Sequence, residues 1–259
     1  MVERPVAVVT GAATGVGAAC ARWFARQGYD VLVNYRSSEA AAEQVVEQCL
    51  AAGVDCVAVQ GDVAEDVDCR GVAAMAIDRW NRIDILINSA GTTLFRPMSD
   101  LEALSAEDFG AIFAVNVVGA YQMVRAVAPV MARNAGGAVV NVSSIAGMNG
   151  TGSSYAYAAS KGALNTLTLS LARNLAPRIR VNAVAPGMIE GRWLLEGLGE
   201  VSYERVRDDF ARESALGAVA TPDNVAETVG WLSTRAELMT GQLVVVDAGM
   251  MLGRPPVVA

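Results

Sequence analysis

Short apolar runs, mostly of β-branched residues, recur along the 259-residue chain and alternate with longer stretches in which apolar positions repeat every three or four residues. A short apolar run bounded by turn residues predicts a buried strand, whereas the longer repeat predicts an amphipathic helix. Strands are predicted at Val6–Val9, Val31–Asn34, Asp55–Gln60, Ile83–Ile87, Gly137–Val142, Ile179–Val184 and Gln242–Asp247. Because these seven strands alternate with helices throughout, the chain is predicted to form a doubly wound α/β fold, a parallel sheet flanked by helices.

The stretches between the strands supply the helices. Helices are predicted at 18–27, 40–52, 67–81, 104–133, 155–176 and 222–232. The longest of them is expected to be interrupted around Asn116. Residues 188–220 are rich in Gly, Leu and charged residues, which is typical of a substrate lid and also of amphipathic helices packed on a core. No Pro- or Ser-rich linker divides the chain, so residues 1–259 are predicted to form a single domain.

A glycine-rich turn, TGAATGVG at residues 10–17, follows the first predicted strand and precedes the first predicted helix. Glycines allow a tight turn and a close approach of backbone N–H groups to a pyrophosphate, and a helix N-terminus favours negative charge. The arrangement predicts a Rossmann-type dinucleotide site formed by Gly11, Thr14, Gly15, Val16 and Gly17. The alternative is an ordinary glycine turn.

The end of the second predicted strand bears on the choice between NADP(H) and NAD(H). NAD-preferring proteins commonly carry an acidic residue there, which binds the ribose 2′-hydroxyl. This chain has Asn34-Tyr35-Arg36-Ser37 instead, so no carboxylate of that segment competes with a 2′-phosphate, and Arg36 could pair with one. NADP(H) is therefore predicted as the preferred cofactor, with Tyr35 and Ser37 beside it and NAD(H) possible. A solvated loop arginine is the alternative.

Tyr157 and Lys161 lie four residues apart on one predicted helix, and Ser144 lies near the carboxyl end of the strand Gly137–Val142. A free phenol, with a pKa of about 10, is a weak acid. The cation of Lys161 would stabilise the phenolate and lower that pKa, while Ser144 would hold a substrate oxygen. The trio predicts hydride transfer to a carbonyl with Tyr157 as the proton donor. A lone Tyr-x-x-x-Lys more often marks only a helix surface.

Tyr-x-x-x-Lys at 157–161, preceded thirteen residues earlier by Ser144, resembles the classical short-chain dehydrogenase/reductase family, and the resemblance covers nearly the whole chain. It implies a ketone reductase or alcohol dehydrogenase that is most similar to the 3-oxoacyl-thioester reductases and the sugar dehydrogenases of the family. It also implies that Asn116 is a catalytic residue and that the protein is a homotetramer. Further cofactor contacts implied by the family motifs are Asp62, Val63, Asn88, Ala90, Gly91, Tyr157, Lys161, Pro186, Gly187 and Ile189. Ser89 and Gly191 depart from the family pattern.

Composition narrows the function classes. The net charge of −7 and the lack of a Lys/Arg cluster argue against a nucleic-acid or anionic membrane partner. No apolar run approaches the roughly 18 uninterrupted residues of a membrane span. A small-molecule carbonyl or alcohol substrate is therefore predicted.

The cysteines and the missing histidine narrow the chemistry further. Four cysteines without C-x-x-C spacing are expected to be buried thiols in a reducing cytoplasm. The chain has no histidine, which excludes a Ser-His-Asp triad and the common His-ligated zinc sites, and no metal site is expected. A non-catalytic NADP-binding sensor is the alternative from another class, since a dinucleotide fold does not by itself imply turnover.

Overall fold

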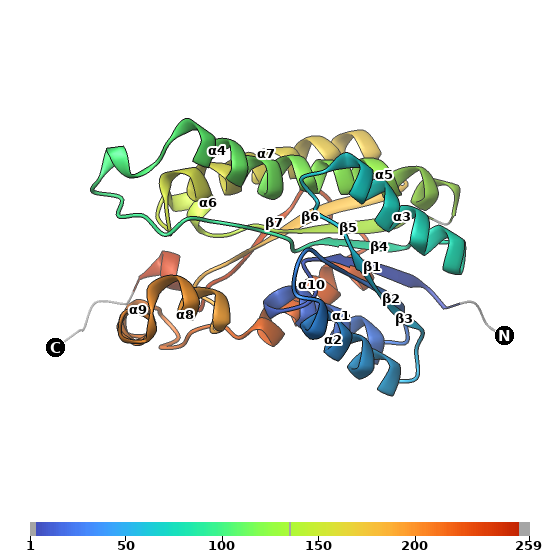
Figure 1. Cartoon of the computed structure of the whole chain (residues 1–259), viewed down its shortest axis with the longest axis horizontal. Coiled ribbons are helices and arrows are strands. Elements are labelled where there is room, and N and C mark those ends of the chain that lie inside the picture. The colour runs from blue at the N-terminus through green and yellow to red at the C-terminus, as the bar shows by residue number, and fades with distance from the viewer. Residues whose placement is uncertain (1–3, 135, 254–259) are drawn as a thin grey trace.

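A parallel sheet runs through the middle of the molecule in the computed structural model, which describes residues 4–134 and 136–253 (Figure 1). Within those residues the strands are β1 (Val6–Thr10), β2 (Asp30–Tyr35), β3 (Cys56–Gln60), β4 (Ile85–Asn88), β5 (Gly137–Val142), β6 (Ile179–Pro186) and β7 (Leu243–Val246). They pair in the order β3-β2-β1-β4-β5-β6-β7, and every pairing is parallel. The predicted doubly wound sheet of seven strands is confirmed.

Helices cover both faces of this sheet (Figure 1). One face carries α1 (Gly15–Arg26), α2 (Glu39–Ala51) and α10 (Pro222–Thr234). The other carries α3 (Asp66–Trp80), α4 (Ala106–Phe113), α5 (Ala120–Arg133) and α7 (Tyr155–Leu175), with the short α6 (Ala146–Asn149) against α7. Short 3-10 turns lie at Leu101–Ala103 (η1) and Met250–Leu252 (η3).

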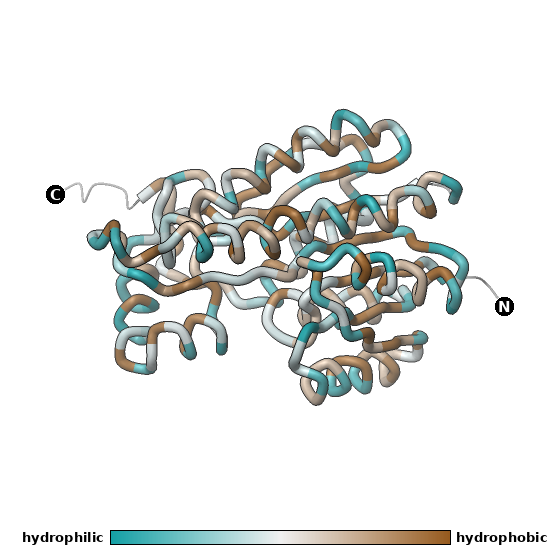
Figure 2. The backbone as a smooth tube through the Cα atoms, turned by 45° about the horizontal axis from the view of Figure 1, so that its top comes forward, coloured by the Kyte–Doolittle hydropathy of each residue, from teal (hydrophilic) through white to brown (hydrophobic). Residues whose placement is uncertain are grey.

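Two hydrophobic cores result, one on each face of the sheet. Successive strand side chains point to opposite faces, so Ala7 and Val9 of β1 pack beneath α1 and α10 whereas Val8 packs beneath α3 and α5. Figure 2 shows the hydrophobic strands inside and hydrophilic residues along the outer turns. Burial on both faces explains why the strands read as continuous apolar runs rather than as alternating ones.

The predicted 104–133 helix is divided in the structure, as expected. It begins at Ala106, because Ser105 accepts a hydrogen bond from the backbone of Asp108 and forms a capping box with that residue. A π-helical segment, η2 (Ala114–Gly119), then separates α4 from α5. Asn116 lies within it, and such segments often occur at functional sites.

Residues Ala106–Arg133 are long and apolar enough, by length and composition, to cross a membrane, and no other helix of the described residues is. A core helix passes the same test. This one packs against α3 and α7, and Met123, Val127 and Met131 of α5 are fully buried in the core. We therefore assign the segment to the layer that covers the sheet.

The strand order reverses direction between β1 and β4. The chain leaves β1 toward β2 on one side, and it returns to β4 on the other side. In open α/β sheets, ligands bind in the crevice outside the carboxyl ends of the strands at this switch point. The predicted Gly-rich turn after β1 and the segment Ser89–Gly91 after β4 both lie there.

Candidate active site

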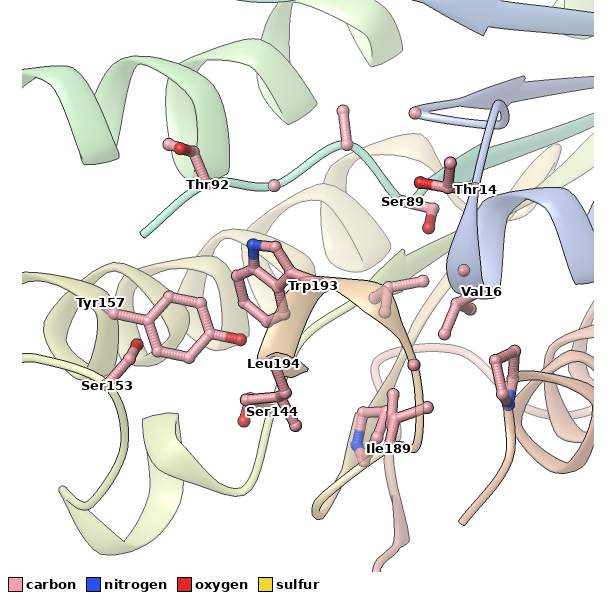
Figure 3. A pocket seen from close by; sticks show the side chains of 18 of the residues that line it. Thr14, Val16, Ser89, Thr92, Ser144, Ser153, Tyr157, Ile189, Trp193 and Leu194 are labelled. Carbon is pink, nitrogen blue, oxygen red and sulfur yellow. The ribbon is translucent and has the colours of Figure 1, made fainter. Parts of the chain in front are cut away.

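A cavity of about 710 Å³ follows the carboxyl ends of the strands, and both Arg36 and Trp193 line it. Figure 3 shows the part of it around Tyr157, Ser144 and Trp193. Most of the predicted site residues line the cavity: Gly11, Thr14, Gly15, Val16, Tyr35, Arg36, Ser37, Asp62, Val63, Ala90, Gly91, Ser144, Tyr157, Lys161, Pro186, Gly187 and Ile189. Gly17, Asn88 and Asn116 are absent from that lining and lie behind it. The topology thus brings residues from six strand ends to one crevice.

The glycine turn after β1 fits a pyrophosphate. Gly11 has a φ of +60°, and a Cβ there would lie 2.7 Å from the Cα of Ala90. A Cβ on Gly17 would lie 2.4 Å from the carbonyl oxygen of Gly11, so Gly17 allows α1 to pack on the turn. No side chain caps α1 and its first turn holds no acidic residue, which leaves its N-terminal N–H groups free for an anion.

Arg36 and Asp62 lie side by side at the far end of the cavity, with 3.7 Å between the guanidinium and the carboxylate. The local sequence contains no carboxylate that would compete for Arg36, but the structure brings one from the end of the neighbouring strand, because β2 and β3 are adjacent and parallel. Asp62 does not cap a helix: its carboxylate accepts from the backbone of Ala64, and α3 begins only at Asp66. Arg36 therefore has a partner within reach.

Tyr157, Lys161 and Ser144 converge on the middle of the cavity. Ser154 caps α7 by accepting from the backbone of Tyr157, which fixes the first turn of that helix. The Tyr157 hydroxyl lies close enough to Ser144 for that residue to favour its deprotonated form. The Lys161 ammonium lies 5.7 Å from the centroid of the Tyr157 ring and donates to the carbonyl of Val142 at 2.8 Å. The three side chains predicted from spacing are thus neighbours.

Tyr155, the other tyrosine of this helix turn, is directed elsewhere. Its hydroxyl donates to the carbonyl of Met98 at 2.6 Å, and it does not line the cavity. Two residues along a helix correspond to roughly 200° of rotation, so Tyr155 and Tyr157 face different surroundings. This agrees with the choice of Tyr157 over Tyr155.

Burial moves the pKa values of the central pair in opposite directions. Desolvation raises the pKa of Tyr157 to about 12, and the nearby Ser144 side chain opposes that rise. Desolvation lowers the pKa of Lys161 to about 8. The direction for Tyr157 is opposite to the lowering expected from the sequence, because the site is more enclosed than the spacing alone indicates. A lowered phenol pKa stays a prediction for the complex with cofactor.

Two buried asparagines support the cavity from behind. The Asn116 side chain accepts from the Thr92 backbone N–H at 2.8 Å, donates to the Thr92 carbonyl at 3.0 Å and donates to Ser160 at 2.9 Å. It therefore ties the loop after β4 to α7. Asn88 donates to Asn141 at 2.9 Å and so joins the ends of β4 and β5. In this structure both residues position the loops that line the cavity.

The segment after β6 accounts for one departure from the family pattern. Ile189 pairs with Ala220 in an isolated parallel bridge, which anchors the segment to the start of α10. Gly191 has a φ of +148°, which a threonine rarely adopts, and its N–H donates to the Tyr203 hydroxyl at 3.3 Å. The backbone path at residue 191 therefore requires glycine.

Residues 188–220 form two helices, α8 (Arg192–Leu198) and α9 (Glu200–Glu213), which Figure 1 shows side by side. They also contribute Trp193, Leu194, Leu198, Val206 and Phe210 to the lining of the cavity. Phe95 and the segment Thr151–Ser153 line the cavity as well. Phe95 could not be predicted from the sequence as a site residue, because a single aromatic residue in an irregular loop carries no periodic or motif signal.

The glycine turn beneath an uncapped helix and the Ser-Tyr-Lys cluster define the chain as a dinucleotide-dependent oxidoreductase. A family model described as "Enoyl-(Acyl carrier protein) reductase" matches residues 11–251. The chain belongs to the short-chain dehydrogenase/reductase family, and it is an NAD(P)-dependent enzyme.

Similar proteins span the same length. The "Granaticin polyketide synthase putative ketoacyl reductase 2" of Streptomyces violaceoruber is 39% identical over 96% of this chain and 97% of that protein. The 3-oxoacyl-(acyl-carrier-protein) reductase FabG of Staphylococcus aureus is 33% identical over 95% of this chain and 98% of its own. A "putative short-chain dehydrogenase/reductase" structure from Burkholderia xenovorans superposes with a TM-score of 0.91, at 43% identity, over 98% of this chain and 100% of that chain.

Proposed function

We propose that the protein reduces a ketone, of the 3-oxoacyl type or another, with NADPH. The observation that carries the proposal is the cluster in the cavity in which the Tyr157 hydroxyl lies near Ser144, with the ammonium of the buried Lys161 5.7 Å from the phenol ring. The names of two relatives, a ketoacyl reductase and a 3-oxoacyl reductase, support the substrate type. The apolar residues around the cluster favour a ketone over a sugar or polyol.

The residues divide the work by position. The turn Gly11–Gly17 and the N-terminus of α1 would hold the pyrophosphate. Lys161 donates one of its three N–H groups to the Val142 carbonyl, which leaves two to bind hydroxyl groups of the cofactor ribose. The bound nicotinamide would supply the hydride. Ser144 would then donate a hydrogen bond to the substrate oxygen as negative charge develops on it, and the Tyr157 hydroxyl would give that oxygen its proton. The cation of Lys161 would stabilise the phenolate left behind.

Absorbance at 340 nm tests the proposal directly, because it follows oxidation of NADPH in the presence of a panel of ketones. Turnover of at least one 3-oxo compound or simple ketone is expected. Tight cofactor binding without turnover of any ketone would contradict the proposal and would favour a cofactor sensor.

Arg36→Ala is expected to weaken NADP(H) binding by about 1–3 kcal/mol and to leave NAD(H) binding nearly unchanged. The lower end of that range is expected, because the Arg36 side chain is 64% exposed and Asp62 competes for it. Fluorescence titration with both cofactors measures the effect. Arg70→Ala is the control, since Arg70 is also exposed and paired with an aspartate but lies on α3 away from the cavity. Equal losses for both cofactors in Arg36→Ala would remove the 2′-phosphate role.

We further propose a homotetramer in which the helices around 104–133 and 155–176 pack across one interface. Large apolar side chains are exposed on that layer: Phe109, Val118, Tyr121 and Leu169. Light scattering at micromolar concentration is expected to give four times the 27.0-kDa mass of the chain. A monomer mass would contradict this assembly.

A cytoplasmic location is also part of the proposal. Cys20, Cys49, Cys56 and Cys69 are buried free thiols. Thiols of this kind persist in a reducing compartment.

A further inference from the structure

Aromatic side chains line the end of the cavity beyond Tyr157. The Trp193 and Tyr157 ring centroids lie 5.9 Å apart, and the Trp193 and Phe95 centroids lie 6.1 Å apart. Figure 3 shows the Trp193 side chain beside Tyr157, with the phenol oxygen directed toward the space between Trp193 and Ser144. A carbonyl held at Ser144 and Tyr157 therefore places the rest of its molecule against aromatic faces and edges.

Hydrogen bonds and close packing hold these rings in place. The backbone N–H of Arg96 donates to the Ser153 carbonyl at 2.9 Å, and the Thr93 and Ser153 hydroxyls are 2.6 Å apart, so the loop that carries Phe95 is tied to the segment before α7. A Cβ on Gly197 would lie 2.0 Å from the Phe95 ring. The glycine thus lets α8, which carries Trp193, pack directly on Phe95.

The arginines of α8 and α9 all have carboxylate partners, whereas Arg96, next to Phe95, is exposed and donates to the Phe95 carbonyl. Arg192 is paired with Glu196 in α8 at 3.1 Å. The other arginines of residues 191–214, all of which the structure describes, are also paired: Arg205 with Asp209, Arg207 with Asp208 and Arg212 with Asp209. Four arginines stand against six carboxylates in that stretch, so the lid carries net negative charge. A phosphodiester-bearing carrier would meet repulsion there.

From these features we infer that the substrate is a ketone with a flat ring next to its carbonyl, and that Trp193 selects it. The inference rests on the proposed ketone reduction and narrows it. Aromatic rings attract one another in offset or edge-to-face contacts at centroid distances of about 4.5–7 Å, so a substrate ring packed against Phe95 and Trp193 gains contacts that a flexible acyl chain does not.

The experiment compares three carbonyl probes: 1-tetralone, 2-butanone and acetoacetyl-coenzyme A. In the wild type, kcat/KM for 1-tetralone is expected to exceed that for acetoacetyl-coenzyme A. Trp193→Ala is expected to lower kcat/KM for 1-tetralone by roughly tenfold to a hundredfold, and that for 2-butanone by less than about threefold. Trp193→Phe, which keeps a ring, is expected to recover much of the loss.

Trp231→Ala is the control for loss of an indole. Trp231 is 44% exposed, close to the 49% of Trp193, and it lies on α10 outside the cavity lining. It is expected to behave as the wild type does with all three probes. Equal behaviour of Trp193→Ala and Trp231→Ala would overturn the selecting role, and a preference for acetoacetyl-coenzyme A would overturn the substrate class.

Calorimetry separates this inference from the proposed function. In Tyr157→Phe loaded with NADPH, where proton transfer is removed, 1-tetralone is expected to bind, and adding Trp193→Ala is expected to weaken that binding at least tenfold. If no ketone is reduced by the wild type but this binding pattern holds, the proposed reduction fails while the ring selectivity stands. If 1-tetralone does not bind, or binds equally with and without Trp193, the inference fails whatever the turnover.

Discussion

Tyr157→Phe is expected to lower kcat for ketone reduction by on the order of 10²-fold or more while NADPH affinity persists. The substitution removes the hydroxyl that meets Ser144 but keeps the ring that packs near Trp193 and Lys161. The proton donor is therefore lost without a cavity in its place. Steady-state kinetics by absorbance at 340 nm, together with cofactor titration, separates these two effects.

Tyr155→Phe is the internal control for this loss. It removes the same oxygen from the same helix turn, but that hydroxyl donates to the Met98 carbonyl outside the cavity. Its kcat is expected to stay close to that of the wild type. An unchanged kcat in Tyr157→Phe, or an equal fall in both variants, would remove Tyr157 from the role of proton donor.

The fold followed from the sequence because its signals are local. Strands buried on both faces are continuous apolar runs, and β1, with Val8 facing one core and Val9 the other, could be recognised without knowledge of its neighbours. Tyr157 and Lys161 were also a local signal, since four residues along a helix bring two side chains to one face. Ser144 lies on another element, and its place near the carboxyl end of a predicted strand, together with the family motif, connected it with that pair.

Features that depend on distant neighbours could not be predicted from the sequence. Asp62 reaches Arg36 because β2 and β3 lie side by side, and the sequence of the segment Asn34–Ser37 does not predict that pairing. Phe95 contacts Trp193 across nearly a hundred residues of sequence and belongs to no motif. Burial acts in the same way: the direction of the Tyr157 pKa shift depends on how many elements close over it.

Lys161→Met is expected to produce the second large effect, a shift in pH dependence. Methionine keeps much of the length of the side chain and removes its charge. A cation near the Tyr157 ring favours phenolate, so its removal raises the phenol pKa, which burial already raises to about 12. Alcohol oxidation needs phenolate, so its half-maximal pH is expected to move upward. Reduction needs phenol, so it is expected to lose its alkaline fall-off, and cofactor binding is expected to weaken.

Lys161 is the only lysine among the 259 residues, which makes the charge in this argument directly measurable. Protein grown on lysine labelled at Cε is expected to give one side-chain signal in the NMR spectrum, and without cofactor this signal should titrate near the pKa of about 8 that burial gives Lys161. Comparing that titration with the pH profiles of wild type and Lys161→Met shows whether the charge of Lys161 sets the pKa of the Tyr157 phenol. If the oxidation midpoint stays in place in Lys161→Met while the rate merely drops, Lys161 only holds the cofactor, and Tyr157 must be tuned by Ser144 and the bound nicotinamide.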